Sequence, residues 1–180
     1  MDDTIFALSS GAPPAAIGII RISGPRSGAA LAELAGKLPP ARSPRVRTLR
    51  DRTGSVLDTT LVLWFPGPQT ATGEDLAEIH CHGGRAVIAA ISRSLADMEG
   101  LRAAEPGEFT RRVGMLVRKD NLGFGARSWR YAAIVNDGVI EALFVEPGMC
   151  DNHGEDPYGV SSPETVLEYL AEDAKGVAAE

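Results

Sequence analysis

Three side chains able to bind a ligand or exchange a proton alternate along one short segment. The segment Leu76–His82 places Glu78, His80 and His82 on one face of a predicted strand and Cys81 on the other face. A carboxylate and two imidazoles are costly to bury without partners. The pattern therefore predicts either a ligand-binding face centred on Glu78 or an exposed polar face on an edge strand.

An arginine lies inside a second predicted strand. Arg21 falls within Ala15–Ile22, where the other residues are apolar or glycine and several are β-branched, as is typical of a buried strand. An unpaired arginine in such a strand is rare. Arg21 should therefore face an anion, which is either a ligand or the carboxylate of a structural salt bridge.

Two further features near Glu78 suggest binding chemistry. The histidines of His80-Cys81-His82 suggest a metal site, but the alternation directs the Cys81 thiol away from them, and we expect no metal. Gly83 and Gly84 precede a predicted helix, where free backbone N–H groups can bind an anion. A tight turn without a ligand is an equally good explanation of the two glycines.

The elements that must position these residues mix strands with helices. Besides the two strands above, strands are predicted over 57–65 and 101–104, and helices over 27–36 and 85–98, with another beginning at 106–108. This mixture predicts an α+β fold with a mixed sheet.

A different pattern follows in the last third of the chain. Strands are predicted at 129–135 and 139–145 around the turn Asn136-Asp137-Gly138, which suits a two-residue hairpin. A final helix should begin at Ser162-Pro163-Glu164 and end near Ala174. Its apolar residues predicted to face inward are Val166, Leu167 and Leu170. The last residues, 175–180, should fray.

Charge changes along the chain. Residues 1–112 carry 13 Lys and Arg against 12 Asp and Glu, whereas residues 113–180 carry 5 against 12. The step indicates two segments of different origin, and neither is basic enough to bind nucleic acid through charge alone. The chain offers no long apolar span, no basic signal-peptide start and only two cysteines, Cys81 and Cys150. We expect a cytoplasmic protein without a membrane partner.

Four blocks within residues 1–112 carry a family resemblance. They are the segments 3–5 (DTI), 18–25 (GIIRISGP), a central block within 64–84 (WFPGP, TGED, then Glu78 and HGG) and 105–112 (EPGEFTRR). In this order they resemble the N-terminal domain of the tRNA-modifying GTPase family called MnmE or TrmE. The resemblance implies a domain of residues 1–112 that binds a tetrahydrofolate derivative, in the 5-formyl or methylene form, and forms a homodimer.

The same resemblance implies a set of site residues and partners. Arg21 and Glu78 would contact the folate, with His82, Gly83 and Gly84 nearby. A carboxylate can accept two adjacent N–H groups of a pterin, and an arginine can pair with a folate carboxylate or carbonyl. The family further implies an FAD-dependent protein partner and the wobble uridine of tRNA as the modified group.

Several features of that family are missing from this sequence. It contains no G-x-x-x-x-G-K-[ST] motif for GTP and no Cys-x-Gly-Lys motif. By counting, Arg118 falls where the family has a third, basic folate contact, but its neighbours differ and the role does not transfer. We therefore expect a module that is not catalytic alone.

A second resemblance covers residues 113–180. The segments that carry it are 122–132 (LGFGARSWRYA), 135–140 (VNDGVI) and 156–162 (DPYGVSS). They resemble the C-terminal part of a peroxiredoxin, so the hairpin and helix would be the end of a thioredoxin-like fold. Arg130 would match the arginine that supports the peroxidatic thiolate. The motif that carries the peroxidatic cysteine, Pro-x-x-x-Thr-x-x-Cys, is absent, so no nucleophile for peroxide is evident.

Three hypotheses follow. The first is a folate-binding, self-associating module of tRNA modification that lacks the GTPase domain. The second is a remnant of a thiol-dependent peroxidase. The third is a chain joined near Arg112 that has neither activity.

Overall fold

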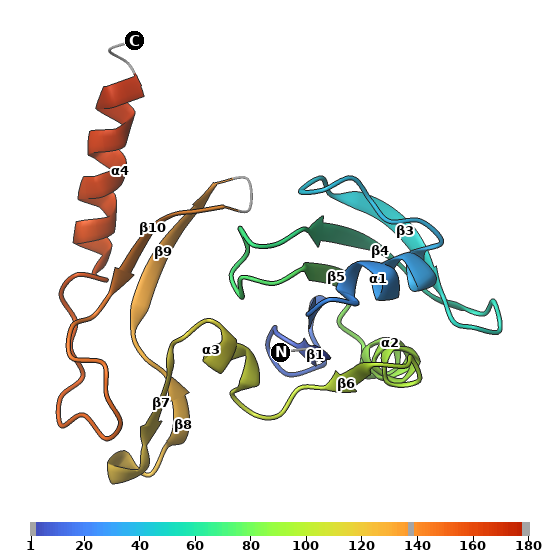
Figure 1. Cartoon of the computed structure of the whole chain (residues 1–180), viewed down its shortest axis with the longest axis horizontal. Helices are drawn as coiled ribbons and strands as arrows, with labels where there is room; N and C mark the ends of the chain where they lie inside the picture. The colour runs from blue at the N-terminus through green and yellow to red at the C-terminus, as the bar shows by residue number, and fades with distance from the viewer. Residues whose placement is uncertain (1–2, 137–138, 178–180) are drawn as a thin grey trace. The chain divides into compact units, whose positions relative to one another are not determined.

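The chain forms two compact units, Met1–Glu105 and Pro106–Glu180, in a computed structural model (Figure 1). The structure describes residues 3–136 and 139–177. Each unit contains its own strands and helices.

A six-stranded mixed sheet forms the first unit, with the strand order β3-β4-β5-β2-β1-β6. Neighbouring strands are antiparallel except β1 and β6, which are parallel. The strands are β1 (Thr4–Leu8), β2 (Ile17–Ser23), β3 (Arg45–Arg50), β4 (Val56–Phe65), β5 (Leu76–His82) and β6 (Leu101–Ala103), and the helices are α1 (Ser27–Ala35) and α2 (Arg85–Ala96). The predicted α+β class with a mixed sheet is confirmed.

One hydrophobic core joins the two helices to alternate residues of the sheet. Ile20, Ile22 and Ile79 contribute from the central strands, and all three are fully buried. On α2 the buried residues are Ile88, Ile91 and Leu95, the spacing of one helical face. Because strand side chains alternate, the residues between the buried ones, including Arg21 and Glu78, belong to the other face of the sheet.

In the first unit the structure adds two strands that the sequence did not predict, β1 and β3. β3 carries three arginines, and of its apolar residues Leu49 is buried while Val46 is 64% exposed. It is an edge strand that pairs only with β4 in the six-stranded order. An edge strand needs little apolar sequence, because only part of it contacts the core.

The second unit contains two separate hairpins. One joins β7 (Leu116–Lys119) to β8 (Gly125–Ser128) through a short 3₁₀ helix, η1 (Asp120–Leu122), and was not predicted. The other joins β9 (Tyr131–Asn136) to β10 (Val139–Val145) and was predicted. The remaining elements are α3 (Glu108–Arg112) and α4 (Pro163–Val177). Residues 137 and 138 of the predicted turn, and residues 178–180 of the predicted frayed end, lie outside the described residues.

The prediction that Leu167 and Leu170 face inward is wrong. They are 63% and 43% exposed, while Val166 is half-buried. α4 contacts the second hairpin through Tyr169, whose ring packs edge-on against Phe144 with 5.6 Å between centroids. Helical spacing predicts which residues share a face, but it does not predict that another element covers that face.

A buried carboxylate organises the loop that precedes α4. Glu146 is 2% exposed, and its Oε1 accepts hydrogen bonds from the backbone N–H groups of Gly159 and Ser161, both at 2.8 Å. The Ser161 hydroxyl donates to the same oxygen at 2.6 Å. The hydrogen bond from the Ser161 hydroxyl, with those from the backbone, lowers the pKa of Glu146 to about 2. Trp129, which is also buried, donates from Nε1 to the Glu146 backbone oxygen at 2.7 Å.

Acid should therefore loosen this loop well below the ordinary pKa of a glutamate. Because the pKa of Glu146 is lowered in the folded state, the ionised carboxylate stabilises the fold. This contribution is complete at pH values above the ordinary pKa of 4.5, and it is lost as the pH falls toward 2. We expect the amide resonances of Gly159 and Ser161 to shift between pH 4 and pH 2, and this dependence should vanish in Glu146→Gln. A midpoint near 4.5 in the wild-type chain would contradict the assigned hydrogen bonds.

Candidate functional site

An ion pair bridges the two central strands on the face of the sheet that the core does not use. Arg21 on β2 and Glu78 on β5 are direct partners in the antiparallel register. The Arg21 Nε donates to Glu78 Oε1 at 2.8 Å. The arginine side chain is 45% exposed and the carboxylate only 14%, so the pair is accessible mainly from the arginine side.

A histidine holds the other oxygen of the same carboxylate. His80 Nε2 lies 2.8 Å from Glu78 Oε2, and its side chain is 24% exposed. Burial alone would raise the pKa of Glu78, but the hydrogen bonds from His80 and Arg21 outweigh it and lower the pKa below 4.5. The three side chains, Arg21, Glu78 and His80, form one connected group, called here the Glu78 cluster. Glu78 is therefore an ionised acceptor at neutral pH.

Apolar side chains flank the Glu78 cluster on the same face. Leu63 of β4 is the register partner of Glu78, and Leu61 and Ile19 are the partners of His80. All three are half-buried. Among the described residues, the structure gives Arg21 no partner other than Glu78, which it contacts through Nε. The cluster thus offers an ionised acceptor, further N–H donors on Arg21 and an apolar surround.

The structure places the predicted residues in two groups. Arg21 and Glu78 contact each other, so the salt-bridge alternative for Arg21 is present in the chain itself. His82 instead pairs with Asp58, with Nδ1 at 2.8 Å from Oδ1, and the His82 backbone N–H donates to Oδ2, also at 2.8 Å. Burial would raise the pKa of Asp58, but these hydrogen bonds lower it overall.

Two of these contacts are not predicted by the sequence pattern. The alternation puts His80 on the observed face without assigning it a partner, and no predicted role falls on Asp58. The alternation of β5 could have indicated His80, because residues two apart on a strand lie on the same side. Asp58 offers no local signal, because its partner is 24 residues away in the sequence.

The two glycines after β5 have different surroundings. Gly83 lies against the backbone of Ala15, and a Cβ at Gly83 would sit 2.2 Å from the Ala15 carbonyl oxygen. The two segments also exchange backbone hydrogen bonds, from Ala15 N to Gly83 O at 3.0 Å and from Gly83 N to Ala16 O at 3.2 Å. Gly84 is the N-cap of α2, and a Cβ there would meet open space.

Cys81 points away from the histidines, as the alternation predicted. It is 1% exposed, and its Sγ lies 3.3 Å from the backbone oxygen of Gly18. Burial raises the pKa of the Cys81 thiol, which disfavours the thiolate that binds metals. Within the described ranges, no group of three His, Cys, Asp or Glu side chains is arranged to hold a metal ion.

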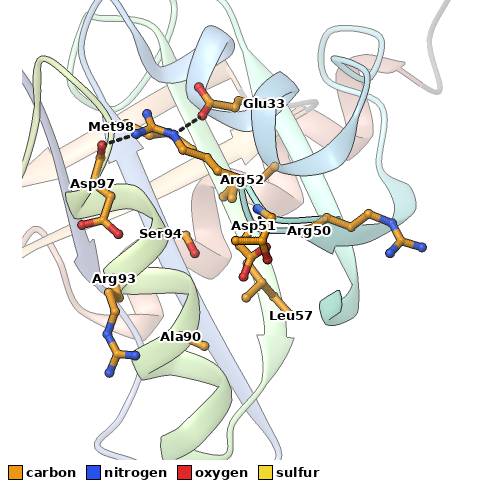
Figure 2. A pocket seen from close by; sticks show the side chains of 12 residues that line it. Glu33, Arg50, Asp51, Arg52, Leu57, Ala90, Arg93, Ser94, Asp97 and Met98 are labelled. Atoms are coloured by element: carbon orange, nitrogen blue, oxygen red, sulfur yellow. Dashed lines mark hydrogen bonds and ion pairs between the residues drawn. The ribbon is translucent and has the colours of Figure 1, made fainter. Parts of the chain in front are cut away.

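A cavity of about 220 Å³ lies elsewhere in the first unit, among α1, the β3–β4 turn and α2. Arg52 crosses it, with Nε donating to Glu33 at 2.8 Å and a terminal nitrogen donating to the Asp97 backbone oxygen at 2.6 Å (Figure 2). Leu34, Met98 and Leu57 belong to or pack against the hydrophobic core, which places the cavity on the helix side of the sheet. It is separate from the Glu78 cluster, which lies on the opposite face.

In the second unit, the arginine of the peroxiredoxin resemblance is held by an acidic residue. Arg130 forms an ion pair with Asp156, and its guanidinium lies over the Tyr158 ring at 4.8 Å from the centroid. Cys150 lies exposed in the loop after β10.

No helix in the described part of the chain combines the length and the apolar composition needed to cross a bilayer.

Comparison with solved structures gives a likeness to the 1-Cys peroxiredoxin of Plasmodium falciparum. It is 30% identical, covers 49% of this chain and 52% of that one, and has a TM-score of 0.36.

Comparison with protein families and curated relatives concerns mainly the first unit. The model of the family described as GTP-binding protein TrmE N-terminus matches residues 4–115. Proteins named tRNA modification GTPase MnmE from Erythrobacter litoralis and Novosphingobium aromaticivorans are 68% and 66% identical, over 62% and 63% of this chain. One from Rhodopseudomonas palustris is 55% identical over 82% of this chain and 39% of its own length. The chain spans about a quarter of the first two relatives, 26% of each. The matched residues make up well over half of the sequence, and the chain therefore belongs to the TrmE N-terminal family.

Proposed function

We propose that residues 1–112 form a tetrahydrofolate-binding module of the tRNA wobble-uridine modification system, without catalytic activity of its own. The observation that carries this proposal is the Glu78 cluster. The two residues that the family resemblance assigns to folate, Arg21 and Glu78, are direct cross-strand partners on an accessible face. Family membership supports the same assignment.

The chemistry of the Glu78 cluster suits a reduced pterin. The lowered pKa keeps Glu78 ionised, and a carboxylate can accept hydrogen bonds from the ring N–H and the adjacent amino group of a pterin. The guanidinium of Arg21 carries N–H groups beyond the Nε that Glu78 uses, and these can bind a carbonyl or carboxylate of the ligand. The half-buried Ile19, Leu61 and Leu63 would cover the flat ring.

The proposed ligand is a 5-formyl or methylene tetrahydrofolate. His82, Gly83 and Gly84 would form the rim of the site, four to six residues beyond Glu78 in the sequence. In this arrangement His82 would reach the ligand while Asp58 holds its Nδ1. Gly83 would contribute by keeping the end of β5 close to the start of β2.

The proposed partners follow from the family. The module would form a homodimer, would associate with an FAD-dependent enzyme, and would act in the cytoplasm on tRNA. Sedimentation equilibrium of the purified chain at micromolar concentration should give a dimer mass. A monomer mass over the whole concentration range would contradict the homodimer.

Calorimetric titration with 5-formyltetrahydrofolate tests the proposed function directly. We expect saturable binding, and p-aminobenzoylglutamate, which keeps the tail but lacks the pterin, should not compete. Absence of binding by the wild-type chain would favour a joined chain with neither activity. Hydrogen peroxide turnover abolished by Cys150→Ser would favour the peroxidase alternative instead.

A further inference from the structure

Both oxygens of the Glu78 carboxylate are already engaged inside the chain. Arg21 Nε occupies Oε1 from the neighbouring strand, and His80 Nε2 occupies Oε2 from the same strand, each at 2.8 Å. An ionised carboxylate can only accept hydrogen bonds, so the Nε2 of His80 must carry its hydrogen in this contact. Two donors on opposite oxygens fix both the position and the plane of the carboxylate.

The surroundings leave His80 with one polar task. Its cross-strand neighbours, Ile19 and Leu61, are apolar, and its own strand presents Glu78 on one side and His82 on the other. His82 is held by Asp58. Among the described residues, the side-chain partner of His80 is Glu78, which in turn pairs with Arg21. A ligand with two parallel N–H groups binds more tightly to a carboxylate whose plane is set in advance, because ordering it on binding would cost free energy.

We propose that His80 is a positioning residue of the folate site and orients the Glu78 carboxylate before the ligand arrives. This inference rests on the proposed function, and it adds a residue that the family resemblance did not assign. His80 acts through Glu78, so the loss of its Nε2–H donor should weaken ligand binding. The imidazole ring itself is not required for this role, which depends only on an N–H donor to Glu78 Oε2.

Two variants separate the hydrogen bond from the shape of the side chain. His80→Leu removes the donor, and we expect the affinity for 5-formyltetrahydrofolate to fall about tenfold, because a hydrogen bond to a charged group is lost. His80→Gln keeps an N–H donor within reach of Oε2 and should remain within about threefold of the wild-type affinity. Calorimetry gives the affinities, and thermal unfolding shows that both variants are folded.

A second measurement does not depend on folate. The hydrogen bond from His80 lowers the pKa of Glu78, so the carboxyl carbon of Glu78 should titrate at a higher pH in His80→Leu than in the wild type or in His80→Gln. An unchanged Glu78 titration in His80→Leu would overturn the positioning role whether or not folate binds. Equal folate affinity of His80→Leu and wild type would also overturn it, as would His80→Gln binding as weakly as His80→Leu. Failure of the wild-type chain to bind folate would instead remove the proposed function on which the role depends.

Discussion

Replacing Glu78 with alanine should weaken the binding of 5-formyltetrahydrofolate by at least tenfold. The carboxylate is only 14% exposed and is held by two charge-assisted contacts, so its removal takes the main acceptor from the site. It also leaves Arg21 and His80 without the group that orders them. When the ligand is bound, Glu78 and the ligand would form a buried, charge-assisted pair. Truncating one partner of such a pair costs roughly 2–5 kcal/mol of binding free energy, and about 1.4 kcal/mol already corresponds to a factor of ten in affinity.

Glu33→Ala is the matched control for this experiment. Glu33 also accepts a 2.8 Å hydrogen bond from an arginine Nε, that of Arg52, but it lies beside the cavity on the helix side of the sheet. The control therefore removes a similar pair without touching the Glu78 cluster, and the folate affinity should stay at the wild-type value. Calorimetric titration of the wild type, Glu78→Ala and Glu33→Ala with 5-formyltetrahydrofolate measures the three affinities. Equal affinities of wild type and Glu78→Ala would remove Glu78 from the site.

The strands around the Glu78 cluster could be predicted from sequence because their signal is local. β5 begins and ends at the predicted residues. As predicted, Ile79 and Cys81 lie on the opposite face from Glu78, and the structure buries both. The pairing of Arg21 with Glu78 could not be predicted in this way. The two residues are 57 positions apart, and the register that makes them partners is set by the packing of the whole sheet.

Three of the four unpredicted strands, β3, β7 and β8, share a physical cause as well. β3 and the β7–β8 hairpin bury few apolar side chains, so no hydrophobic periodicity marks them. In α4 the periodicity was present, but Leu167 and Leu170 remain exposed. β1 is the exception, because Ile5 and Phe6 are buried although this short apolar run was not predicted as a strand. Elsewhere, local patterns indicated the elements with a covered face, whereas edge strands and uncovered faces depend on tertiary partners that the pattern does not show.

Gly83→Ala should destabilise the first unit strongly, although the substitution adds a single methyl group. The new Cβ would lie 2.2 Å from the carbonyl oxygen of Ala15 and 2.6 Å from its carbonyl carbon. Both atoms belong to the backbone, so no side-chain rotation can relieve the overlap. The segments must separate, which lengthens the two hydrogen bonds between Gly83 and residues 15–16. We expect a loss of at least about 2 kcal/mol in the free energy of unfolding.

Gly84→Ala is the control one residue further along. Its Cβ would meet open space, and Gly84 has extended backbone angles, φ −70° and ψ 138°, that alanine adopts readily. Because alanine is a poorer N-cap than glycine, the substitution should cost roughly 0.5–1 kcal/mol, well below the loss expected for Gly83→Ala. Urea unfolding measures both variants and is followed by the fluorescence of Trp64, which packs against the core of the first unit. Trp129→Phe serves as the background, because it removes the other tryptophan. If Gly83→Ala unfolds at the same urea concentration as Gly84→Ala, the close approach of β5 to Ala15 is not a fixed feature of the fold. A selective loss in Gly83→Ala would show that the first glycine of this pair is required by backbone packing, independently of any ligand at the rim of the site.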